Sequence, residues 1–350
     1  MATSVPAPTE STGSRMTAAV ATRYGPPDVI ELQQVETPVP ADHEVLVRVH
    51  ATTVTAADYR IRGFSVPWSY WLPARVALGI RRPKHGILGM EFAGEIEAVG
   101  ADVDAVCVGQ PVFGLAGQNL GANAEFLCLD PAGTDVALAP KPPELTYEQA
   151  AALPLGGLTA LQFLREADIH EGTRVMIYGA SGSVGTYAVQ LATYFGATVT
   201  GVCSTDNLEL VSSLGADAMI DYTVEDVTRI NTTYDVIFDT VGKCPYGWAV
   251  RSLATHGAFL HAVGTPAVDL RMRITELRSD KRTVGGVTRA DVEALSFLGE
   301  LVASGVIDTV IDRTYPLDQV VDAHSYADTR HKTGNVVLAV THGDPAPAAR

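Results

Sequence analysis

The sequence predicts an α/β protein of two domains, a barrel-like β domain followed by a doubly wound parallel sheet. The first reason is length, because 350 residues exceed what one ordinary hydrophobic core accommodates. The second is that short strand-like runs with glycine and proline turns fill residues 16–140. The third is that strand-like and helix-length segments alternate from residue 174 onwards, which is the pattern of βαβ units.

Within the first domain, apolar and polar residues alternate as they do in half-buried strands. The clearest runs are residues 44–50 and 94–100, and residues 109–114 and 124–129 continue the pattern. Glycines bound the run at 94–100, which places turns at both of its ends. Many short strands with such turns favour a barrel-like arrangement.

The second domain is expected to begin with a helical segment at residues 147–164, interrupted at 153–157. A further helix is expected at 290–304, and a final strand at 334–340 is expected to rejoin the first domain. Helix-length segments between the strands place helices on both faces of a parallel sheet. The strands of that sheet are expected at residues 174–178, 198–203, 218–222, 234–240, 257–263 and 282–287.

Composition excludes several classes of function. A hydrophobic content of 47% with 19% charged residues is typical of an ordered protein. The net charge of −15, without a basic stripe, argues against a nucleic-acid partner. No apolar run approaches the roughly 18 residues that span a bilayer, so we expect no membrane association.

The cysteines and the chain ends indicate a cytoplasmic protein. The four cysteines are far apart and form no Cys-x-x-Cys pair, which favours reduced thiols over a disulfide framework or a metal cluster. Residues 1–15 are rich in Pro, Ser and Thr and contain no apolar run typical of a signal peptide. We expect residues 1–15 and 342–350 to be disordered tails.

A glycine-rich turn is the most informative motif. An apolar strand at 174–178 leads into Gly179, Gly182 and Gly185, and a helical run follows at 186–195. One glycine permits the tight turn, one permits a pyrophosphate to approach the backbone, and one permits the helix to pack on the sheet. The helix N-terminus supplies N–H groups and a favourable dipole for phosphates. We therefore expect a dinucleotide cofactor at Ala180, Ser181, Gly182, Ser183 and Val184.

Further motifs accompany this turn in a consistent order. They are Gly-Met-Glu-Phe-Ala-Gly-Glu-Ile at 89–96, Ala-Leu-Pro at 152–154, Leu-Thr-Ala at 158–160, Leu-Gly-Ala-Asp at 214–217 and Tyr-Asp-Val-Ile-Phe-Asp-Thr-Val-Gly at 234–242. Together with the glycine turn, they resemble the medium-chain dehydrogenase/reductase superfamily, and within it the zinc-independent quinone oxidoreductase-like branch. The resemblance implies a GroES-like catalytic domain (16–143 and 312–341), a Rossmann domain (144–311) and a cofactor in the cleft between them.

The resemblance also indicates whether this protein can bind a catalytic zinc ion. Zinc-dependent relatives carry three ligands at positions that correspond here to Thr55 or Ala56, to Met90, and to Leu155 or Gly156. A catalytic zinc requires about three N, S or O ligands from the protein, and two of these three places offer none. We therefore expect no zinc. Hydride transfer to a quinone or an α,β-unsaturated carbonyl is then favoured over alcohol oxidation, because such an acceptor needs only hydrogen-bond donors and a proton.

The end of the second strand of the parallel sheet bears on the choice between NADP(H) and NAD(H). No carboxylate stands where NAD-selective proteins place one, and the hydroxyls of Ser204 and Thr205, together with Asn207, suit a 2′-phosphate. In the resembled branch a Tyr and a basic residue hold this phosphate. Tyr222 matches the Tyr, but Asp206 stands near the place of the basic residue, where we interpret it as a helix N-cap. We expect NADP(H).

Other cofactor contacts follow from the resemblance. Thr159 corresponds to a nicotinamide contact, and Asn335 aligns with a C-terminal position that contacts the cofactor in some relatives. Val241, Val263 and Gly264 follow strands of the parallel sheet, at the edge where cofactors lie in such sheets.

The substrate side departs from the family pattern. Relatives have Asn-Pro-x-Asp in the first domain, whereas Thr55 replaces that Asn here. We consider Thr55 and Tyr59 as hydrogen-bond donors to the substrate, while the Tyr59 ring has packing as its alternative role. Asp58 is interpreted as a cap of the following helix.

An aromatic segment follows. Trp68, Tyr70 and Trp71 form either a lid that stacks on a planar substrate or a packed surface helix, and the sequence leaves both open. The basic residues 81–84 are most simply a solvated turn. As alternative functions we retain an enoyl-thioester reductase and an NADP(H)-binding protein without catalysis. Relatives lead us to expect a homodimer through the sheet edge at 282–288.

Overall fold

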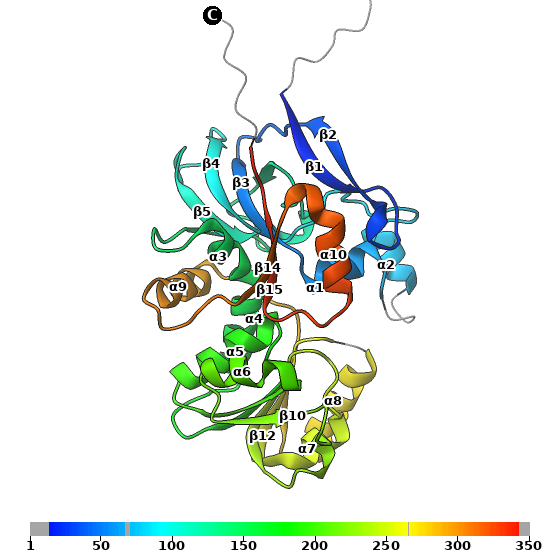
Figure 1. The fold of residues 1–350 in the computed structure, drawn as a ribbon, viewed down its shortest axis with the longest axis vertical. Coiled ribbons are helices and arrows are strands. Elements are labelled where there is room, and N and C mark those ends of the chain that lie inside the picture. Colours follow the sequence, from blue (N-terminus) through cyan, green and yellow to red (C-terminus); the bar gives the residue numbers. More distant parts are fainter. Residues whose placement is uncertain (1–13, 67–70, 265, 343–350) are drawn as a thin grey trace, which may run out of the picture.

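A computed structural model describes residues 14–66, 71–264 and 266–342, so Trp68, Tyr70 and nearly all of both expected tails lie outside the described residues. Figure 1 shows two lobes joined through α4 (Pro154–Glu166), with the N-terminal strands in one and the parallel sheet in the other. In the described ranges, no helix is long and apolar enough to cross a membrane.

The first lobe contains a hairpin and a large sheet. The hairpin pairs β1 (Arg15–Ala21) with β2 (Ile30–Glu36). The large sheet has seven strands. Their order is β14 (Ile311–Pro316), β15 (Asn335–Ala339), β3 (Val45–Thr53), β4 (Glu91–Val99), β5 (Pro111–Leu115) and β7 (Ala137–Pro140), with β6 (Phe126–Leu129) paired to β3 outside this order. The expected final strand therefore does rejoin the first domain.

Three helices complete this lobe: α1 (Ala56–Arg62), α2 (Trp71–Leu78) and α10 (Val320–Asp328). A capping box starts α1. The Thr55 hydroxyl accepts from the N–H groups of Ala57 and Asp58, and the Asp58 carboxylate accepts from the Thr55 N–H at 2.8 Å. Thr55 is thus the N-cap, and Asp58 closes the box from the third helical position instead of capping directly.

The second lobe is a six-stranded parallel sheet with the strand order β10, β9, β8, β11, β12, β13. Numbered from β8, this order reads 3-2-1-4-5-6, which is the Rossmann arrangement. The strands are β8 (Arg174–Tyr178), β9 (Thr198–Cys203), β10 (Ala218–Asp221), β11 (Tyr234–Asp239), β12 (Leu253–His261) and β13 (Arg282–Gly285). The same half of the chain forms α5 (Ser183–Tyr194), α6 (Leu208–Ser213), α7 (Tyr246–Ser252) and α8 (Pro266–Arg278), while α3 (Tyr147–Ala152) and α9 (Val292–Ala303) pack on the sheet of the first lobe.

One buried apolar cluster connects the two sheets. It extends from Phe113 in β5 through Leu161 in α4 to Ile177 in β8, and each of these side chains is almost fully buried. Because both sheets pack against the same helical segment, their strand ends face one another across a defined gap.

Candidate active site

A cleft of about 1790 Å³ lies between the lobes. Its walls come from both sheets: Thr53 and Tyr59 belong to the first lobe, whereas Gly182 and Val241 belong to the parallel sheet. It opens beside the carboxyl ends of β8 and β11, where the strand order reverses direction. Ligands of doubly wound sheets bind at this point.

The glycine turn after β8 permits the tight turn and the close helix packing that the sequence predicts. Gly179 adopts a left-handed φ of +86°, and a Cβ there would lie 2.6 Å from the Val241 Cγ1. A Cβ on Gly185 would lie 2.1 Å from the Gly179 carbonyl oxygen, so this glycine permits close packing of the helix. Gly182 is the N-cap of α5, no side chain caps it, and the space above it is open. The helix N-terminus is therefore available to an anion.

The segment that begins at Gly334 and continues into β15, here called the return strand, is hydrogen-bonded directly to this turn. The Gly334 N–H donates to the Ser181 carbonyl at 2.8 Å, and Gly182 and Gly334 pair as a parallel bridge. The Ser183 hydroxyl donates to the Asn335 Oδ1 at 2.6 Å. Two predicted cofactor residues 152 positions apart are thus brought into contact.

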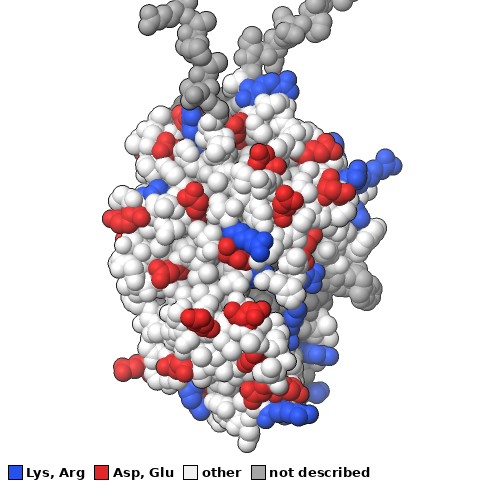
Figure 2. Space-filling model, in the orientation of Figure 1, with Lys and Arg blue, Asp and Glu red and all other residues white. Residues whose placement is uncertain are grey.

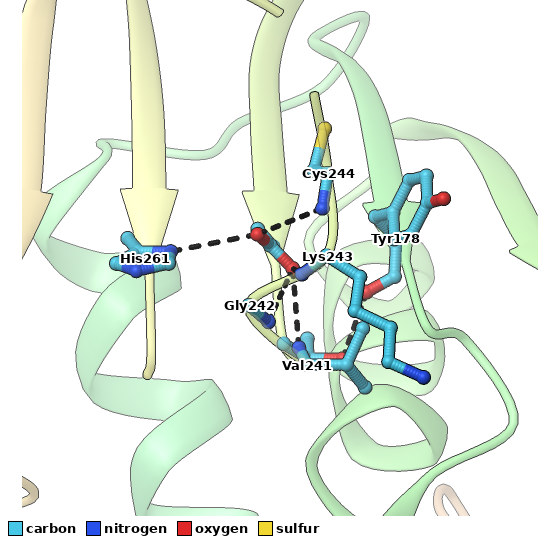
Figure 3. A network of polar contacts seen from close by, with 8 residues as sticks. Tyr178, Val241, Gly242, Lys243, Cys244 and His261 are labelled. Carbon is cyan, nitrogen blue, oxygen red and sulfur yellow. Dashed lines mark hydrogen bonds and ion pairs between the residues drawn. The ribbon is translucent and has the colours of Figure 1, made fainter. Parts of the chain in front are cut away.

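A second turn, residues 241–244, is held by one buried carboxylate (Figure 3). Asp239 ends β11 and accepts from four successive N–H groups, of which the Gly242 N–H is nearest at 2.8 Å. The His261 Nδ1 lies 3.5 Å from the same carboxylate. This arrangement holds Val241 and Lys243 at the cleft wall, and we infer that the turn is ordered before any ligand binds.

Most predicted cofactor residues line the cleft, but not all of them do. Ala180 is fully buried, and its neighbour Ser181 contributes a carbonyl to the return strand. Thr159 is held in place because its hydroxyl donates to the Leu155 carbonyl and shares a 2.6 Å contact with Thr288. The predicted residues that line the cleft are Thr55, Tyr59, Thr159, Gly182, Ser183, Val184, Val241, Val263, Gly264 and Asn335.

Ser204, Thr205, Asn207 and Tyr222 gather at the carboxyl ends of β9 and β10. The Tyr222 N–H donates to the Cys203 carbonyl, and the Asn207 amide donates to the Ser204 hydroxyl at 3.0 Å. The Thr205 hydroxyl donates to Asp221 at 2.5 Å.

The interpretation of Asp206 as an N-cap is wrong. Asp206 lies inside a 3-10 turn, Thr205–Asn207, and Asn207 is the N-cap of α6. The Asp206 side chain is exposed, so the local backbone does not require a carboxylate at position 206.

The substrate residues have different environments. The Thr55 hydroxyl donates to Asp58 at 2.6 Å, so its proton is already engaged. Tyr59 is partly buried and lines the cleft. Trp71 is half exposed on α2 and is not among the cleft residues, and the Arg75 guanidinium lies 5.2 Å from its ring centre. For Trp71, the packed surface helix is the better description.

Sequence reasoning missed many polar residues in the cleft, and among them are Thr53, Glu91 and Lys332. The Glu91 carboxylate accepts from the Thr53 hydroxyl and, at 2.6 Å, from the Leu155 N–H. Burial raises the pKa of Glu91 to about 7 and lowers that of Lys332 to about 8. The available signal was a carboxylate that opens an otherwise apolar stretch, Glu91-Phe92-Ala93.

The side chains at the positions of the zinc ligands do not suit zinc. Thr55, Met90 and Leu155 supply no set of three N, S or anionic O donors. In the part of the chain that the structure describes, no three His, Cys, Asp or Glu side chains gather as a metal site. On the face shown in Figure 2, acidic side chains spread over both lobes, and basic side chains gather along the right-hand edge of the view.

The fold and the cleft together define a two-domain oxidoreductase that binds a nicotinamide cofactor. Residues 41–141 match the alcohol dehydrogenase GroES-like domain, and residues 214–338 match the zinc-binding dehydrogenase family. The chain is 31% identical to "Quinone-oxidoreductase QR1, chloroplastic" of Triphysaria versicolor, over 88% of this chain and 93% of that protein.

Two further comparisons support the same family. "NADPH-dependent alkenal/one oxidoreductase, chloroplastic" of Arabidopsis thaliana is 29% identical, over 92% of this chain and 79% of that protein. The quinone oxidoreductase structure from Coxiella burnetii superposes with a TM-score of 0.84 at 31% identity, covering 94% of this chain and all of that one. The chain belongs to the medium-chain dehydrogenase/reductase superfamily, in its quinone oxidoreductase-like branch.

Replacing Gly334 by Ala tests the join between the glycine turn and the return strand. Gly334 has a φ of +59°, and an added Cβ would lie 2.3 Å from the Val310 carbonyl oxygen. We expect Gly334→Ala to lower the unfolding free energy by about 2–5 kcal/mol, the sum of a left-handed backbone and a clash. Chemical denaturation measures this.

Gly172→Ala is the matched control. Gly172 has a φ of +82° but open space around its Cβ position, so its loss is expected to be only about 1–2 kcal/mol. Equal losses of unfolding free energy in the two variants would show that the contact with Val310 does not contribute to stability.

Proposed function

We propose that this protein is a zinc-independent, NADPH-dependent reductase of quinones and α,β-unsaturated carbonyls. The observation that carries the proposal is the cleft itself. It combines a glycine turn suited to a pyrophosphate with hydrogen-bond donors, and no triad of metal ligands stands at the family's zinc positions. The relatives named as quinone and alkenal/one oxidoreductases support the substrate class.

The bound cofactor would supply a hydride, and the protein aligns the acceptor with it. Val241 and Val263 stand at the carboxyl ends of β11 and β12 and would pack on the nicotinamide. Thr159, held by the Leu155 carbonyl, would orient it from α4, the helix that joins the lobes. Addition of hydride to a conjugated carbonyl leaves negative charge on the oxygen, which Tyr59 is positioned to stabilise by a hydrogen bond.

A panel of electron acceptors tests this proposal. We expect NADPH oxidation, followed at 340 nm, with quinones, enals and enones, and much slower turnover with simple alcohols and NADP⁺ because alkoxide stabilisation is missing. Enoyl thioesters form a separate arm, and turnover only with them would favour the thioester reductase. Cofactor binding without turnover of any acceptor would favour a binding protein.

We further propose that NADP(H) is preferred over NAD(H). β9 ends at Cys203 without a carboxylate, and Ser204 and Tyr222 stand together beside that end. Asp221 is one of two nearby acids, with Asp206, and it is engaged by Thr205 and by the Thr223 hydroxyl at 2.6 Å. One relative is named as NADPH-dependent.

Fluorescence titration with both reduced cofactors measures this preference. We expect a Kd for NADPH at least tenfold below that for NADH, equivalent to about 1.4 kcal/mol from contacts with the 2′-phosphate. Asp206→Lys is expected to widen the gap, because it replaces a repelling charge by an attracting one. A tighter Kd for NADH in the unmodified protein would contradict the preference.

The edge strand β13 supports a homodimer. β13 pairs only with β12 in the described sheet, and Val287 beyond its end is 86% exposed. Leu270 and Leu277 on the neighbouring α8 are also exposed, which leaves apolar surface next to this edge strand. Light scattering is expected to give about twice the chain mass of 37.0 kDa, and a monomer mass would refute the dimer.

A further inference from the structure

Glu91 is a carboxyl group whose burial opposes its ionised form. It opens β4, it is 1% exposed, and yet it belongs to the cleft wall. One oxygen accepts from the Leu155 N–H at 2.6 Å, and the other is bonded to the hydroxyl of Thr53, which is itself 2% exposed and lines the cleft. A hydroxyl between a buried carboxyl group and open space can accept a proton on one side while donating on the other.

The charges around Glu91 hold it close to a balance between its two protonation states. Asp58 on α1 raises its pKa and Lys332, in the segment before β15, lowers it, while burial is the largest influence. The result is a pKa of about 7, so both forms are populated at neutral pH. Lys332 faces Glu91 and Asp312, and its ammonium donates to the Gly334 carbonyl.

The proposed reaction requires a proton, and the two donors predicted from the sequence, Thr55 and Tyr59, are poorly placed to give it. The Thr55 hydroxyl already donates to Asp58, which has its own bonds to backbone N–H groups. Tyr59 can donate a hydrogen bond to the developing oxyanion while keeping its own proton. A carboxyl group that is partly protonated at pH 7 is the better source.

We propose that Glu91 is the proton source of this cleft and that it acts through the Thr53 hydroxyl, an inference that rests on the proposed reductase function. The hydride adds to the β-carbon of the acceptor, the C=C electrons form a bond toward the carbonyl carbon, and the C=O electrons pass to oxygen. That oxygen takes the Thr53 proton and becomes an enol. Thr53 takes the Glu91 proton, and the resulting carboxylate regains a proton from water.

The pH dependence of enal reduction by the complete protein tests this inference. In the unmodified protein, kcat/KM is expected to be high below pH 7 and to fall about tenfold per pH unit above it, because the donor must be protonated. Glu91→Gln is expected to lower kcat by about 10²-fold or more, to remove this alkaline decline, and to leave the Kd of NADPH unchanged.

Three companion variants separate proton delivery from a structural role. Lys332→Met removes a cation that lowers the pKa of Glu91, so the alkaline decline is expected to move to higher pH. Thr53→Val is expected to resemble Glu91→Gln, and Thr53→Ser to restore most of the rate. Tyr59→Phe is expected to lower kcat while leaving the position of the decline unchanged.

The outcomes distinguish the two proposals. Turnover by the unmodified protein establishes the reductase function independently of Glu91. An alkaline decline that persists in Glu91→Gln, or that does not move in Lys332→Met, would overturn the role of Glu91 alone. If Glu91→Gln does not fold, Lys332→Met and the Thr53 pair still decide the question. Failure of the unmodified protein with every acceptor would remove both proposals.

Discussion

The site depends on one short stretch of backbone pairing between chain segments about 150 residues apart. The bridge between Gly182 and Gly334, with the bond from Gly334 to Ser181, connects the turn after β8 to the strand that returns into the first lobe. Only glycine suits position 334, because Val310 occupies the space of a Cβ. The cleft walls are therefore joined at the glycine turn itself, and the Ser183–Asn335 contact follows from that join.

Three buried carboxylates hold the loops around the cleft in place. They differ in the number of backbone N–H groups that donate to them. Asp239 receives four N–H groups and Asp58 receives those of Thr55 and Gly89, so each orders a turn or a helix start. Glu91 receives a single N–H. Burial of a carboxylate is costly unless hydrogen bonds compensate for lost water. The least compensated of the three also faces the open cleft, and this combination supports the role proposed for Glu91.

Much of the fold was predictable because its signals are local. Alternating strands and helices, the glycine turn and the break at Pro154 each depend on residues close in sequence, and the parallel sheet follows from them. Glu91 was missed because its significance depends on Leu155, which is 64 positions away, and on burial that spacing does not reveal. Asp206 was misassigned because the actual N-cap, Asn207, is an equally suitable residue one position later.

The position of β15 has a consequence for how the protein is made. This strand lies between β14 and β3 within the large sheet, although it is the last strand of the chain. The parallel sheet, by contrast, is formed by one continuous segment from β8 to β13. During synthesis, the second lobe can fold while residues 51–53 of β3 still lack their partner strand on one side, although β4 and β6 already pair with β3. This short edge stays open to other chains until residues 335–339 join the sheet.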